Sequence, residues 1–284
     1  MRSWSLAASA AIALACAPLS AATLDGTVEA SMLVEGSVTL SPDGSLASYT
    51  LKQPEKLPPP VVALIAQALP KWKFQFRTPL SAPIEESMSL RIVATDADST
   101  HTTIRIRSAE FEPANQPEKE YVQSVKRWTP AYPEAVRSAG MSGTVYVLVL
   151  VGRDGKVLNA AAEQVNLHRL TDKWNMDAAR RILAAAAVNA IRHWTFSVPT
   201  EGEQAHAPSW YVRIPCRFYL SNEVVDDHAG LTYGTWEIYV RGPRETIAWL
   251  EQKDLAAGAP DATPDGRVHQ LGTGTALVTP LAPD

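Results

Sequence analysis

The most regular hydrophobic pattern in the chain is an apolar, β-branched run from Gly143 to Val151, which predicts a long strand. It is followed by Asp154-Gly155, two residues that tolerate positive φ angles and therefore predict a tight hairpin turn. The rest of the pattern predicts a return strand, a helix and two further extended segments, at residues 156–163, 176–193, 194–198 and 210–219. This order predicts a small unit of antiparallel strands with one helix.

The same order of elements occurs earlier in the chain. A strand with an Asp43-Gly44 turn, a return strand, a short apolar helix and a second hairpin are predicted at residues 38–44, 46–51, 60–69 and 92–106. In both copies the helix runs into a Trp-x-Phe pair, Trp72-Lys-Phe74 and Trp194-Thr-Phe196. We therefore predict an internal repeat, and we interpret these aromatic residues as core rather than as a ligand-stacking platform.

This repeat divides the chain into five predicted parts. They are a signal peptide, a first module, a second module, a short strand and helix extension, and a flexible tail, at residues 1–22, 23–112, 118–222, 223–253 and 254–284. A polar, proline-bearing linker at 112–117 joins the modules. The extension rests on an alternating run at 235–240 and a helical pattern formed by Ile247, Leu250 and Glu251. The tail has few large apolar residues, so it is expected not to offset its ordering entropy.

The N-terminus has the pattern of a secretory signal. Arg2 precedes an apolar stretch at 6–17, and Ser20-Ala21-Ala22 follows with small residues suited to cleavage after Ala22. This predicts export to the periplasm. Two alternatives stay open: a retained membrane anchor, although the stretch is Ala-rich and short for a span, or a lipoprotein modified at Cys16. Cleavage leaves Cys216 as the single cysteine, which we expect to be a buried apolar residue in a strand.

Composition and motifs limit the chemistry. The formal net charge is −4 and no stretch concentrates Lys and Arg, which argues against a nucleic-acid binder. The one tight cluster of metal-capable groups, Asp226-Asp227-His228, is better explained as a solvated loop, and Asp96 and Asp98 as a hairpin tip. No Gly-x-Ser-x-Gly motif occurs. We predict no catalytic residue, no metal site and no cofactor.

Several motifs of the second module occur together in one order. They are Pro130-Ala-Tyr132-Pro133, Gly140-Met-Ser-Gly143-Thr-Val145, Asp154-Gly155, Ala178-Ala179, Ala190-Ile-Arg-His-Trp194-Thr-Phe196 and Phe218-Tyr219-Leu220. With this set, residues 130–220 resemble the C-terminal domain of TonB-type energy transducers. The first module resembles a degenerate copy, because it keeps Asp43-Gly44 and Trp72-Lys-Phe74 but has no Tyr-Pro pair before its first strand.

The resemblance implies an α+β fold of two small TonB-C-terminal-like modules, each an antiparallel sheet with one or two helices packed on it. In that family the domain works in the periplasm and captures the TonB-box strand of outer-membrane receptors by adding it to an exposed sheet edge. By resemblance, the partner contacts are sought at Tyr132 and Pro133 and on the edge strand at Tyr211, Arg213 and Arg217. For Tyr132 and Pro133, a turn that positions the next strand is the alternative.

Three functions remain open. The first is a periplasmic, non-enzymatic protein-binding protein that docks envelope proteins or TonB-dependent receptor segments by strand addition. The second is a membrane-anchored energy transducer for outer-membrane transport, which touches the membrane only if the N-terminus is retained, and for which Pro58-Pro-Pro60 is a very short spacer. The third is an envelope enzyme with an unrecognised site. Exposed edge strands also allow a homodimer formed by edge pairing.

Overall fold

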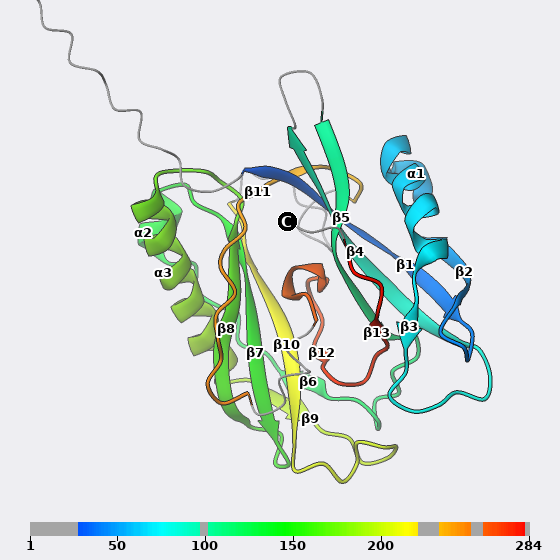
Figure 1. Ribbon diagram of the computed structural model, residues 1–284. Coiled ribbons are helices and arrows are strands. Elements are labelled where there is room, and N and C mark those ends of the chain that lie inside the picture. Colours follow the sequence, from blue (N-terminus) through cyan, green and yellow to red (C-terminus); the bar gives the residue numbers. More distant parts are fainter. Residues whose placement is uncertain (1–27, 97–101, 221–232, 251–257, 282–284) are drawn as a thin grey trace, which may run out of the picture.

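The computed structural model describes residues 28–96, 102–220, 233–250 and 258–281. They form an α+β fold in which two main antiparallel sheets face each other and each carries its long helix on its outer side (Figure 1). This confirms the predicted fold class. The predicted signal peptide, the hairpin tip at 97–101 and Asp226-Asp227-His228 lie outside the described residues. Within the described residues, no helix has the length and apolar character needed to cross a membrane.

The first sheet has the order β11-β1-β4-β5, with β2 paired to β1. Its strands are β1 (Glu29–Leu40), β2 (Leu46–Leu51), β4 (Ile84–Asp96), β5 (Thr102–Pro113) and β11 (Glu237–Tyr239). All pairings are antiparallel, and the β4–β5 hairpin is paired along its whole length. β5 continues to Pro113 and Glu112 is buried, so the predicted linker begins one residue beyond the end of a strand rather than at Glu112.

One face of the first sheet is covered by α1 (Pro59–Ala68), flanked by the short helices η1 (Pro54–Lys56) and η2 (Leu69–Lys71) and by β3 (Phe74–Gln75). Prolines fill its first turn, where no amide donor is required. Val61 and Ile65 face the sheet and are fully buried. Phe74 and Phe111 close the same core with an edge-to-face contact of 5.0 Å between ring centroids.

The second sheet has the order β12-β10-β7-β8. Its strands are β7 (Gly143–Gly152), β8 (Val157–Leu167), β10 (Ser209–Phe218) and β12 (His269–Gln270); β6 (Gln123–Lys126) pairs separately with β9 (Thr195–Ser197), and α2 (Glu134–Ser138) precedes β7. α3 (Lys173–Ile191) is capped at its N-terminus by Asp172, whose carboxylate accepts a hydrogen bond from Asn175 N at 3.1 Å. Its buried residues recur at helical spacing and pack on the sheet: Met176, Ala179, Leu183, Ala187 and Ile191.

The Asp-Gly turns and the Trp-x-Phe pairs meet in the same way in both halves. Phe74 N donates to Gly44 O at 2.9 Å, and Phe196 N donates to Gly155 O at 2.8 Å. Both glycines have positive φ angles (77° and 72°), and a side chain on either would collide with the phenylalanine carbonyl at 2.2 or 2.1 Å. The four aromatic side chains are buried in their cores. The aromatic pairs are therefore core residues, as interpreted from the sequence, and the internal repeat stays a prediction.

The C-terminal residues 258–281 belong to the fold, so the prediction of a flexible tail is wrong for them. η4 (Pro260–Ala262) lies between the two sheets, β12 pairs with β10, and β13 (Ala276–Leu277) pairs with β3 (Figure 1). Asp261 is fully buried, and it accepts hydrogen bonds from Ser108 Oγ at 2.8 Å and Arg241 Nε at 3.0 Å. The tail is therefore held by polar anchors, which its lack of large apolar residues does not reveal.

The predicted extension is only partly correct. The alternating run at 235–240 forms a strand of three residues, β11. In the described part of the next segment, 241–250, the chain makes a turn near Leu250 but no helix, which contradicts the predicted helical pattern. This segment instead lies against β8 through bridges at Val240 and Arg244, and Glu251 falls outside the described residues.

Candidate functional site

The two sheets face each other with their polar sides. On each strand, alternate residues pack under the helix and the residues between them point to the opposite side. On β4 the core residues are Met88, Leu90 and Ile92, and on β10 they are Val212, Ile214 and Cys216. The alternate residues on the opposite faces of these two strands include Ser89, Arg91, Arg213 and Arg217. We call the space between these two faces the polar interlayer.

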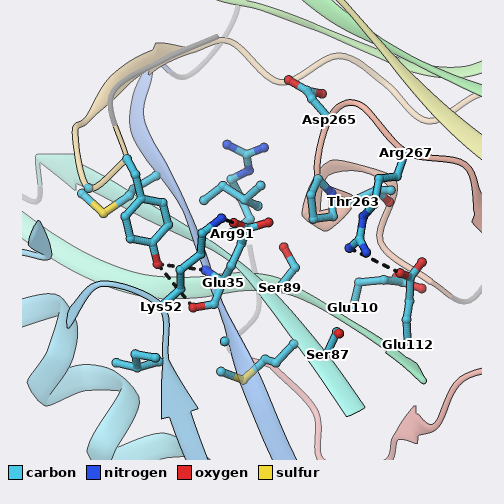
Figure 2. A pocket seen from close by; sticks show the side chains of 18 of the residues that line it. Glu35, Lys52, Ser87, Ser89, Arg91, Glu110, Glu112, Thr263, Asp265 and Arg267 are labelled. Carbon is cyan, nitrogen blue, oxygen red and sulfur yellow. Dashed lines mark hydrogen bonds and ion pairs between the residues drawn. The ribbon is translucent and has the colours of Figure 1, made fainter. Parts of the chain in front are cut away.

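The polar interlayer contains a cavity of ≈ 590 Å³. One wall comes from the first sheet, with Glu35, Ser87, Ser89 and Arg91 projecting into view in Figure 2, and the tail contributes Thr263, Asp265 and Arg267. The other wall includes Tyr146 and Arg217 of the second sheet. Because charges of both signs and several hydroxyl groups line it, this cavity suits polar groups rather than an apolar ligand.

Arg91 and Arg213 hold the interlayer together from opposite sides. Arg91 on β4 donates through Nε to Asp261 O at 2.8 Å and reaches Tyr146 Oη of the second sheet at 3.5 Å. Arg213 on β10 donates through Nε to Glu163 Oε2 at 2.8 Å, and its Nη1 lies 3.9 Å from Glu110 Oε2 of the first sheet. Each arginine is buried and links the two sheets.

Burial and neighbouring charges set the protonation of the interlayer carboxyls. Burial raises the pKa of Glu110 to about 7, although Arg213 acts in the opposite direction. Burial alone would also raise the pKa of Glu237, but His168 and Arg217 outweigh it and hold this pKa below its usual value. The pKa of His168 falls to about 4, mainly because its ring is desolvated. Burial also raises the pKa of Asp265 in the same cavity.

Three of the sequence-predicted contact residues lie on β10. Tyr211 stacks on Trp249, with a centroid distance of 6.2 Å and an interplanar angle of 5°. Arg217 lines the cavity, and its Nη2 donates to Glu237 Oε2 at 2.7 Å. The Arg213 side chain is fully buried in its ion pair with Glu163. This corrects the prediction that the Arg213 side chain contacts a partner, because a charge that has a partner inside the fold is not available at the surface.

Tyr132 and Pro133 lie at the C-terminal end of β10. The Tyr132 ring packs edge-to-face on Phe218 at 5.5 Å, and its hydroxyl donates to Met141 O at 2.5 Å. Pro133 precedes α2, and its carbonyl accepts from Val136 N at 3.0 Å. These contacts support the turn-positioning role, and both residues are partly exposed. The structure therefore brings Tyr132 and Pro133 next to the strand that carries the other predicted residues.

The backbone of β10 is paired unequally on its two sides. Toward the interior it pairs with β7 along its whole length, from Ser209 to Phe218. On its outer side it pairs with β12 only, at Val212↔Gln270 and Arg213↔His269. β4 occupies the corresponding position in the first sheet, and both of its sides are paired along the strand, with β1 and with β5.

The outer edge of β10 offers few backbone donors. Tyr211 O accepts a hydrogen bond from Leu271 N at 2.9 Å, so the backbone groups of Tyr211 point outward. Alternation in an antiparallel ladder places the backbone groups of Arg213, Pro215 and Arg217 on the same side. Pro215 has no N–H, which is tolerated only where a strand edge is not fully paired. The usable donors of this edge are therefore at Tyr211, Arg213 and Arg217.

The sequence interpretation missed the residues that cover this edge, His269 and Gln270. The His269 ring has Nδ1 at 2.6 Å from Glu112 Oε1 and Nε2 at 2.8 Å from Pro264 O. Gln270 Oε1 accepts from Val122 N at 2.7 Å. The one local signal is a short apolar-polar run, Val268-His269-Gln270-Leu271, set between glycines. Within the described residues, no three His, Cys, Asp or Glu side chains are grouped to hold a metal ion.

Comparison with known proteins gives a partial likeness. The chain is 34% identical over 92 residues to Protein TonB of Xanthomonas campestris pv. campestris strain B100 and, equally, to Protein TonB of strain ATCC 33913 of the same pathovar. The alignment covers 32% of this chain and 35% of each relative, so the chain spans about a third of the length of the curated relatives it matches. No protein-family model matches, and no solved structure matches. About a third of the chain is therefore a TonB-like region within an α+β fold.

Proposed function

We propose that this chain is a periplasmic, non-enzymatic protein-binding protein that docks extended segments of envelope proteins, including TonB-dependent outer-membrane receptors, at the outer edge of β10. Backbone groups of an open strand edge supply affinity in this mode, and alternate side chains supply selectivity. The likeness to Protein TonB supports a role in envelope transport.

The observation that carries the proposal is the unequal pairing of β10. Its inner side is fully paired, its outer side is covered over two residues, and the donor at Arg217 lies beyond that cover. The exposed face of Tyr132 and the exposed Tyr219 lie at the same end of the strand. A segment added here would contact backbone and aromatic side chains together.

The same argument assigns different tasks to the two proposed modules. In the first module the edge of β4 is filled by β5, its own hairpin partner. A strand from another protein cannot add there without breaking that hairpin. We assign docking to the second module, which carries the resemblance to the TonB C-terminal domain, and a supporting role to the first, whose polar face completes the interlayer.

Site-specific photo-crosslinking tests this function. A photoreactive phenylalanine analogue at Tyr219, beside the edge, is compared with the same analogue at Trp174, which is exposed on α3. After irradiation in whole cells, we expect adducts from Tyr219 that map to one extended segment of an envelope protein, and none of them from Trp174. A synthetic peptide of that segment should then slow hydrogen exchange in residues 209–218. Adducts of equal yield at both positions would refute docking at β10.

A further inference from the structure

A segment of the chain itself occupies the proposed docking edge. Leu271 N donates to Tyr211 O, and His269 pairs with Arg213. Of the three usable donor positions of the edge, Tyr211 and Arg213 are therefore already paired with residues of the tail. The bound segment is short, and glycines with positive φ angles flank it at Gly266 (86°) and Gly272 (82°).

The side chains of this segment point to two opposite sides, as in any added strand. His269 points to the polar interlayer, where both ring nitrogens lie near oxygen acceptors, Glu112 Oε1 and Pro264 O. Gln270 points the other way, and its amide oxygen caps the backbone N–H of Val122. At this edge the first residue faces the Glu112 carboxylate, a position that suits a basic side chain, and the second is an amide residue that accepts from Val122 N.

The contacts of the segment can be exchanged for those of a similar strand. Apart from the packing of Val268 against the second core, they are hydrogen bonds and ion pairs, so a strand that supplies the same groups leaves no buried polar group unsatisfied. A strand without them leaves the Glu112 carboxylate and the Val122 N–H without these partners, which opposes its binding. A Cβ atom added to Gly266 would meet no other atom within 4 Å, so the chain is free of close packing at one end of the segment.

We propose that residues 268–271 are a tethered stand-in for the partner strand, and that the protein captures an extended segment in which a basic residue is followed by Gln or Asn. The incoming strand replaces His269 at Glu112 and Gln270 at Val122 and takes the backbone positions opposite Arg213 and Tyr211. This inference rests on the proposed function, because it uses the same edge.

A peptide-exchange assay tests the stand-in. The probe is a fluorescent synthetic peptide with the sequence of residues 265–273, and its anisotropy is measured with the full chain. Leu271→Pro removes the N–H that binds Tyr211 O, and Val278→Pro is the matched control because it removes one backbone bond of the same tail, to Lys73 O. A tethered competitor acts at about millimolar effective concentration, so we expect Leu271→Pro to bind the probe at least about tenfold more tightly than Val278→Pro.

The same assay checks the side-chain rule. A probe with alanine in place of the His and the Gln should lose most of its binding to Leu271→Pro, whereas alanine in place of the Thr that corresponds to Thr273, whose hydroxyl donates back to Gln270 O, should have little effect. Equal binding of the probe to Leu271→Pro and Val278→Pro, or unchanged binding of the alanine probe, would overturn the proposal.

A disulfide lock keeps the proposal testable if Leu271→Pro does not fold. In a Cys216→Ala background, Tyr211→Cys and Leu271→Cys place two cysteines at opposed positions whose Cα atoms are about 5.5 Å apart, a spacing that a disulfide can bridge. The reduced protein should bind the probe and the oxidised protein should not. If the oxidised protein, carrying the photoreactive analogue at Tyr219, still cross-links its envelope partner, the stand-in is refuted and docking stands. If exchange behaves as expected but no partner cross-links, the proposed function fails and the stand-in remains.

Discussion

The two sheets differ most at the outer sides of two corresponding strands, β4 in the first sheet and β10 in the second. In the first sheet, β4 is paired on its outer side with β5 over the whole hairpin. In the second sheet, β10 is paired on its outer side only at Val212 and Arg213, with a segment from the C-terminal tail. Both strands carry one core on the helix side and one buried arginine on the other. The difference between them lies in the availability of backbone groups and not in the packing below.

The two edges differ in what they can contribute, to the stability of the fold or to binding. A strand edge that is filled by a hairpin partner contributes to the fold and cannot take another strand. An edge that is covered by a two-residue segment from a distant part of the chain can exchange that segment at lower cost, because few bonds are broken. In the proposed function the edge of β10 is therefore the docking edge, and the outer side of β4 is not.

The largest expected effect concerns the two cores. Trp194→Ala and Trp72→Ala should each lower the free energy of unfolding by roughly 3 to 5 kcal/mol, because each removes a large buried aromatic ring. Trp194→Ala also removes the hydrogen bond from Trp194 Nε1 to Trp128 O at 2.9 Å, so this variant should be the less stable of the two. Urea denaturation measures both. An unchanged stability for Trp194→Ala would contradict its assignment to the core.

The second effect concerns the arginines that link the sheets. Arg213→Ala leaves Glu163 and Glu110 buried without that cation, and we expect a loss of about 3 kcal/mol in the free energy of unfolding. Arg244 also binds Glu163 and compensates part of the loss. Arg137→Ala, which removes an exposed pair with Glu134, is the control and should change stability by less than about 0.5 kcal/mol. Equal effects would mean that the interlayer pairs do not stabilise the fold.

The smallest effect concerns Glu110, an interlayer carboxyl whose pKa is raised by burial. Its pKa is about 7 in the folded state and 4.5 as its ordinary value, so the folded protein holds this proton more tightly than the unfolded chain. The associated stability is present below pH 4.5 and is lost as the pH rises toward 7. Glu110→Gln removes this loss, and should be more stable than the unmodified protein at pH 8 by about 1 to 2 kcal/mol. Melting curves of Glu110→Gln and of the unmodified protein at pH 5 and pH 8 measure this difference. The same stability difference at both pH values would contradict the prediction.

Local patterns predicted most of the regular elements. A continuous apolar, β-branched run and an Asp-Gly turn located β7 and β8, and helical spacing located α3, because these signals lie within a few neighbouring residues. The tail was mispredicted for the opposite reason. Asp261 is held by Ser108, which is 153 residues away in the chain, and no local pattern records such a bond.

The candidate site shows the same division. The resemblance pointed to β10 and to Tyr132, and the structure brings them together through Phe218. It did not reveal that Arg213 is buried, because the carboxylates that bind it, Glu163 and Glu110, come from two different sheets. Charged residues in a strand look alike in sequence whether they face water or a second layer.

Hydrogen exchange of backbone amides, followed residue by residue, tests the central claim most directly. If the tail covers β10 only locally, the outward amides of Tyr211 and Arg213 exchange through opening of β12, whereas the amides that β4 shares with β5 exchange only when the hairpin breaks. We predict that Tyr211 and Arg213 exchange at least about tenfold faster than these β4 amides. Equal protection of the two edges would contradict the account, because the edge of β10 would then be as closed as that of β4.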